Sequence, residues 1–125
     1  MNKEPMKLEE QVVSRALSQE LEKNGYPQQG LWYYNKWSKK PLPSYAENAF
    51  DKYDNEFLAV APTVAELGRA LPDYYNTFRS AQFKLWCCFS GDDAFDEEHS
   101  IDFLADTEAN ARAKMWLHLK KEDLL

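Results

Sequence analysis

The feature that most constrains the fold is an alternation of apolar and polar residues in segments 82–89 and 95–105. A period of two places one set of side chains on one face of a β-strand. The apolar phase consists of Phe83, Leu85, Cys87 and Phe89 in the first segment, and of Phe95, Ile101, Phe103 and Ala105 in the second. The residues between the segments, from Ser90 to Asp93, are typical of a turn. We therefore predict an antiparallel hairpin over residues 82–105 whose apolar phase is buried.

Three other segments show the spacing and terminal residues of helices, namely 7–24, 63–71 and 107–121. The first ends before Gly25, which suits a left-handed C-cap. The second begins with a capping box formed by Thr63 and Glu66. The third begins at Thr107, a favourable N-cap residue. We expect these three helices to cover one face of the sheet.

An aromatic segment at residues 31–37 (LWYYNKW) is typical of a β-strand. Residues 57–61 are expected to be a brief strand or an extended lead-in to the second helix, and residues 38–55 a long loop. Together with the hairpin, these elements predict an α+β fold built on a small antiparallel sheet, with the 31–37 strand near the hairpin. A length of 125 residues is typical of a single domain, here residues 1–125.

Charge and composition exclude several classes of function. The net charge is −6, which disfavours binding to duplex nucleic acid by phosphate neutralisation. No stretch approaches the ~18 apolar residues of a membrane span, and the N-terminal residues lack the apolar region of a secretory signal. The only cysteines, Cys87 and Cys88, are adjacent and would point to opposite faces of a strand, so we expect reduced thiols in a cytoplasmic protein without a membrane partner.

Candidate catalytic and metal-binding residues lack the spacing that their chemistry requires. The acidic stretch 91–102 does not place oxygen ligands as a calcium loop does, and we interpret it as a solvated hairpin tip. His99 and His118 have no nearby partner in a metal-binding motif. We therefore assign no catalytic, metal-binding or cofactor-binding residue and expect no cofactor. A small hydrolase or metal-dependent enzyme, in which a histidine meets a carboxylate or Cys88, is kept as an alternative.

The aromatic and basic stretch 32–40 is the strongest candidate for a binding surface. Trp32, Tyr34 and Lys36 share one phase of the predicted strand, and an exposed set of this kind favours contact with a protein. Stacking on single-stranded nucleic acid ranks lower because of the negative net charge. In the competing interpretation, Tyr33 and Trp37 are core residues and the lysines are a solvated strand edge. The partner is unidentified, and helix 7–24 leaves a homo-oligomer open.

Two motifs, APTVAELGRALP at residues 61–72 and TEANARAKMWL at residues 107–117, carry a resemblance to a known group. Over residues 31–125 the chain resembles small phage- and prophage-borne hypothetical proteins of gut anaerobic bacteria. The resemblance implies an α+β fold and a mobile-element origin, and no activity is assigned to that group. The leading hypothesis is a non-enzymatic accessory protein of a phage or mobile element that acts through protein–protein contact. The alternative of another class is an acidic protein that mimics DNA to bind a basic host protein.

Overall fold

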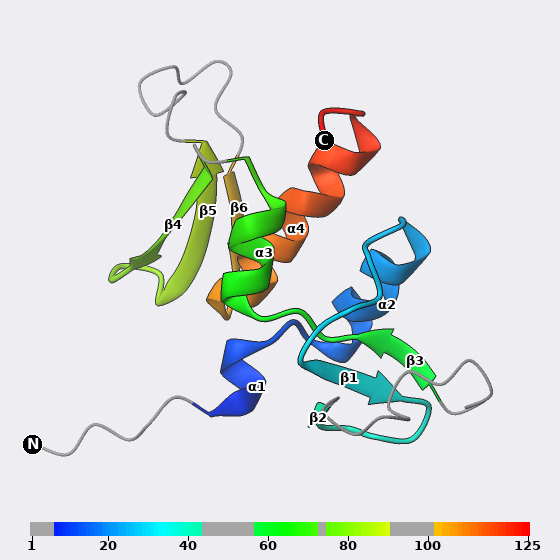
Figure 1. Cartoon of the computed structure of the whole chain (residues 1–125). Helices are drawn as coiled ribbons and strands as arrows, with labels where there is room; N and C mark the ends of the chain where they lie inside the picture. The colour runs from blue at the N-terminus through cyan, green and yellow to red at the C-terminus, as the bar shows by residue number, and fades with distance from the viewer. Residues whose placement is uncertain (1–6, 44–56, 73–74, 91–101) are drawn as a thin grey trace, which may run out of the picture.

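The computed structural model describes residues 7–43, 57–72, 75–90 and 102–125, and it has the predicted mixed α+β architecture (Figure 1). In chain order the elements are α1 (Leu8–Gln11), α2 (Arg15–Lys23), β1 (Trp32–Asn35), β2 (Leu42–Pro43), β3 (Phe57–Val60), α3 (Val64–Ala70), β4 (Tyr75–Ser80), β5 (Leu85–Ser90), β6 (Asp102–Ala105) and α4 (Glu108–Lys121). None of the helices in these ranges combines the length and the apolar character that crossing a bilayer requires.

The described strands form two antiparallel sheets, in the orders β2-β1-β3 and β4-β5-β6. The predicted pairing of the two halves of segment 82–105 is confirmed, with Cys88 opposite Phe103 and Trp86 opposite Ala105. The aromatic strand β1 belongs to the other sheet, where it pairs with β3 and with the short β2 inside the predicted loop. Figure 1 shows α4 lying against β5 and β6, and α4 also contacts α2 and α3.

The strand β4 was not predicted, and it changes where β5 begins. Residues 81–84 form a tight turn between β4 and β5, in which Lys84 takes a left-handed conformation (φ 55°). The Ser80 hydroxyl accepts a hydrogen bond of 3.3 Å from the Phe83 amide. Phe83 lies in this turn with 61% of its surface exposed, so its prediction as a core residue is wrong.

The two faces of β5 are both apolar, and the prediction chose the wrong one as the side toward the helices. Trp86 and Cys88 belong to or pack against the main core, together with Phe103 and Ala105 of β6. Cys87 is also buried, but on the opposite face, where its cross-strand neighbours Phe78 and Leu104 are exposed. Because both phases of LWCCF are apolar, alternation alone could not decide which of them faces α4.

The predicted helix 7–24 is interrupted at residues 12–14, and this part of the prediction is wrong. Val12 has an extended backbone and forms an isolated β-bridge with Thr63, while the Val13 amide donates to the Pro62 carbonyl at 2.9 Å. Ser14 then caps α2 by accepting a hydrogen bond from the Leu17 amide. Pairing with the segment that precedes α3 therefore replaces one turn of helix.

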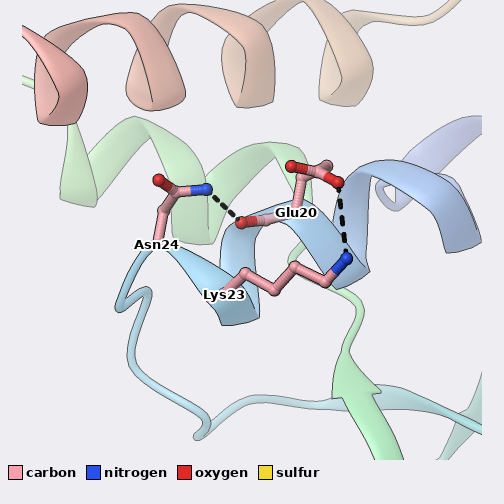
Figure 2. A network of polar contacts seen from close by, with 3 residues as sticks. All are labelled: Glu20, Lys23 and Asn24. Atoms are coloured by element: carbon pink, nitrogen blue, oxygen red, sulfur yellow. Dashed lines mark hydrogen bonds and ion pairs between the residues drawn. The ribbon is translucent and has the colours of Figure 1, made fainter.

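The helix ends follow the local rules that the sequence indicated. The capping box of Thr63 and Glu66 is present at α3, and the Thr107 hydroxyl accepts from the Asn110 amide at α4. At the end of α2, the Asn24 side chain donates to the Glu20 carbonyl at 2.7 Å, and Lys23 lies 3.8 Å from the Glu20 carboxylate (Figure 2). Gly25 follows with a φ of +88°, as the predicted C-cap requires.

Candidate interaction surface

The turn that follows β1, residues 35–40, is here called the Trp37 turn. It is shaped by the side chain of Asn35, whose Oδ1 accepts hydrogen bonds from the amides of Trp37 (2.9 Å) and Ser38 (2.6 Å). The Asn35 amide donates to the Ser38 hydroxyl at 3.0 Å. This is an Asx-type turn, in which a side chain replaces the backbone acceptor. The backbone around Trp37 is therefore held in a defined shape.

The indole of Trp37 is largely open to solvent, with 69% of the residue's surface exposed. Lys36, Lys39 and Lys40 in the same turn are also exposed. Leu31, at the other end of β1, is a further exposed apolar residue. An exposed indole and three exposed lysines in one shaped turn make a surface that is both apolar and positively charged. Such a surface suits contact with an acidic surface that carries apolar side chains.

The turn is also tied to α2 by a charged side chain. The Arg15 guanidinium, in the first residue of α2, donates a hydrogen bond of 2.7 Å from Nη2 to the Lys36 carbonyl. Lys40 lies 3.7 Å from the Glu9 carboxylate, but both side chains are substantially exposed, so this ion pair contributes little stability. Arg15 therefore adds a positive charge beside Lys36, while Glu9 offsets part of the charge at Lys40.

The structure places the three predicted surface residues in different environments. Lys36 is exposed and Trp32 is half-buried against a small core cluster. Tyr34 is only 3% exposed, and its hydroxyl donates to the Val13 carbonyl at 2.9 Å. Burial raises the pKa of Tyr34, and the nearby Glu9 carboxylate adds to the increase. Tyr34 is thus a packing residue and cannot contribute to an exposed surface.

Trp37 is the residue that sequence reasoning misplaced, since the competing interpretation made it a core residue. The alternation of β1 does not extend to position 37, because the pairing with β3 shifts register between Tyr34 and Asn35 and the chain then turns. The signal that could have located this change is Asn35 followed by Lys36 and Ser38. Such a polar run is typical of the end of a strand and of an Asx turn.

The thiols and the described histidine do not form a reactive arrangement. Burial raises the pKa of the Cys88 thiol to about 11, with Arg112 partly opposing the increase, and burial likewise raises the pKa of Cys87. His118 packs against the Phe103 ring, with 5.4 Å between the ring centroids. Within the described ranges, no group of three or more His, Cys, Asp or Glu residues could hold a metal ion. Residues 91–101, which include His99 and most of the predicted acidic tip, lie outside the described part of the chain.

Comparison with known proteins gives no match: no protein-family model, no curated protein and no solved structure is significantly similar to this chain.

Proposed function

We propose that this protein is a non-enzymatic accessory protein that acts through protein–protein contact, and that the Trp37 turn is its contact surface. The observation that carries the proposal is the 69% exposure of Trp37 on a turn held by Asn35 and Arg15. Tryptophan is the residue type most enriched among those that dominate interface energies. An exposed tryptophan on a shaped turn is a feature that a purely structural role does not explain.

The energetics of this surface are favourable for binding. Removing the exposed part of an indole from water contributes on the order of 4 kcal/mol before the cost of association. That cost includes ordering of the loop that binds. In this protein the Asn35 and Arg15 hydrogen bonds order the turn in advance. A larger share of the burial energy would therefore appear as affinity.

The charge of the surface favours an acidic protein segment as partner. Lys36, Lys39 and Lys40 are exposed, and such side chains speed association with carboxylate-rich surfaces and orient them. The same residue types could stack on single-stranded nucleic acid. The net charge of −6 opposes both kinds of acidic ligand at long range, so the choice of a protein depends on the exposed Trp37, a residue type enriched in protein interfaces. An acidic segment that also presents an apolar side chain to Trp37 fits both properties.

The proposed biological setting follows from the resemblance to phage- and prophage-borne proteins. An accessory protein of a mobile element would take a host protein as its partner. The competing DNA-mimic hypothesis requires a continuous acidic surface. The exposed charges of the Trp37 turn, Lys36, Lys39 and Lys40, are basic, and an acidic mimic would not require them at its contact surface. This favours the Trp37 turn as the leading hypothesis.

A titration with defined probes tests the proposal. We would measure fluorescence anisotropy of three labelled probes of equal length: a peptide of alternating glutamate and apolar residues, the same peptide with glutamine for glutamate, and oligothymidylate. We expect saturable binding of the acidic peptide alone. Trp37→Ala should weaken it roughly tenfold or more. Phe83→Ala is the matched control, because Phe83 is a comparably exposed aromatic residue in another tight turn next to a lysine.

Two results would reject the proposed surface. The first is equal affinity of the acidic peptide for the parent protein and for Trp37→Ala. The second is stronger binding of oligothymidylate than of the peptide, which would favour a nucleic-acid ligand.

A further inference from the structure

A second candidate site, separate from the Trp37 turn, lies between α3 and α4. A cavity of about 520 Å³ opens there, a size within the range of small-molecule pockets. Val64 and Ala65 supply apolar wall, and Arg69, Glu108 and Arg112 supply its charges. Most of the lining residues belong to α3 and α4. Residues on helices are held in place better than residues on loops, which suits a preformed site.

Arg112 is the distinctive member of this wall. It is half-buried, and its guanidinium donates from Nη1 to the Val64 carbonyl at 3.4 Å and from Nη2 to the Thr77 hydroxyl at 3.3 Å. Both acceptors are neutral and both distances are long for hydrogen bonds. The buried Nε has no partner, and no carboxylate of the described residues lies within 4.0 Å of the guanidinium. A half-buried cation that has no counter-ion among the described residues is costly to bury, and a bound anion would offset that cost.

Gly68 explains how the guanidinium reaches this position. A Cβ atom at residue 68 would overlap Nη1 of Arg112. The missing side chain therefore lets the guanidinium approach the backbone of α3 at the cavity wall. Glycine in the middle of a helix costs up to about 1 kcal/mol relative to alanine. At position 68 this loss of helix stability is the consequence of leaving space for the guanidinium of Arg112.

The charges of two adjoining cavities differ in sign. The wall of the α3–α4 cavity contains Arg69 and Arg112 against Glu108 alone. The neighbouring cavity, of about 370 Å³ beside Trp86, contains Arg79 against three carboxylates, those of Glu10, Asp106 and Glu108. An anion would therefore select the first cavity and avoid the second.

We propose that the α3–α4 cavity binds a small molecule with a carboxylate or phosphate group, which pairs with the guanidinium of Arg112. A planar guanidinium matches both groups through two parallel hydrogen bonds. Arg69 adds a second positive charge at the rim, and Val64 and Ala65 contact the carbon part of the ligand. This site is independent of the Trp37 turn, so either proposal can fail without the other.

The test is a titration of the full chain at constant ionic strength, in which ¹H–¹⁵N correlation spectra report binding. The probes are succinate, inorganic phosphate and the neutral analogue succinamide. We expect succinate, phosphate or both to shift the backbone signals of Gly68 and Arg69 saturably, and succinamide to leave them unchanged. Binding by only one of the two anions would identify the acid class that the site takes.

Variants then locate the site. Arg112→Met should weaken anion binding roughly ten- to a hundred-fold, as loss of a charge-assisted pair predicts. Arg79→Met, in the neighbouring cavity, should not weaken it. If Arg112→Met does not fold, Arg112→Lys can be used instead. It keeps the charge but removes the planar pair of hydrogen-bond donors, so it should still weaken succinate binding. Absence of saturation by both anions, equal shifts with succinamide, or unchanged affinity in the folded Arg112 variant would overturn the proposal.

Discussion

The guanidinium of Arg15 donates a 2.7 Å hydrogen bond to the carbonyl oxygen of Lys36, which joins the first residue of α2 to the turn that presents Trp37. Arg15 and Lys36 are 21 positions apart in the chain. The position of Trp37 therefore depends on tertiary structure as well as on the local Asx turn. A surface that is held from both sides can present the indole in one orientation to a partner.

The role of Asn35 in shaping the turn can be measured by amide exchange. Asn35→Ala removes the acceptor of the Trp37 and Ser38 amides, so both should exchange faster and stability should fall by about 1 kcal/mol. Asn24→Ala is the matched control, because it removes an asparagine hydrogen bond at the end of α2 (Figure 2). Unchanged exchange at residues 37 and 38 in Asn35→Ala would show that the side chain does not hold the turn.

A double-mutant cycle tests the relation between Gly68 and Arg112. Gly68→Ala should destabilise the protein although alanine favours helices, because the added Cβ overlaps the guanidinium. In an Arg112→Ala background the same change should be neutral or stabilising. Urea denaturation of the four proteins should give a coupling free energy of about 1 kcal/mol or more. Additive effects would mean that the two residues do not interact.

Stability should fall at high pH because burial raises the pKa of four acids, Tyr26, Tyr34, Cys87 and Cys88. Burial raises the pKa of Tyr26 from 10.0 to about 12. The folded state therefore holds this proton more tightly than the unfolded state, so the stability is present below pH 10 and is lost as the pH rises toward 12. The loss should be on the order of 2 kcal/mol.

The contribution of Tyr26 can be separated from that of Cys88, whose pKa is raised from 9.0 to about 11 by burial and which acts in the same direction above pH 9. Tyr26→Phe should show a shallower decrease in the free energy of unfolding between pH 10 and 12. Identical pH profiles for the parent and Tyr26→Phe would refute the assignment.

The thiols should be protected from modification. Burial raises the pKa of both cysteines, and the thiolate is the reactive form. Reaction with Ellman's reagent at pH 8 should be slow in the native protein and fast for both thiols in denaturant. Rapid reaction of one thiol in the native state would reveal an accessible cysteine and would revive a nucleophilic role.

The sequence could predict those elements whose cause is local. The capping residues Thr63 and Thr107 act through nearby backbone amides, and Gly25 supplies its own left-handed conformation. The break at residues 12–14 could not be predicted, because it depends on pairing of Val12 with Thr63, which lies far along the chain.

The faces of β5 and the candidate site show the same limit. Two apolar phases in one strand leave the choice of face to the contacts with α4, which lie outside the strand itself. The prediction located the Trp37 region as an aromatic and basic surface but extended strand alternation through the turn. The exposed residue was therefore taken to be Tyr34, which is buried, while Trp37 was left to the core in the competing interpretation.

Photo-crosslinking from position 37 tests most directly whether the Trp37 turn is a contact surface for an acidic protein. A photoreactive phenylalanine analogue would replace Trp37 in one protein and Phe83 in another, and both would be irradiated in lysate of the source organism. We predict a discrete crosslinked protein from position 37 only, attached through a segment rich in aspartate and glutamate. The crosslink should disappear when Lys36, Lys39 and Lys40 are changed to alanine. Equal products from both positions, or crosslinks at position 37 to nucleic acid alone, would contradict the proposed function.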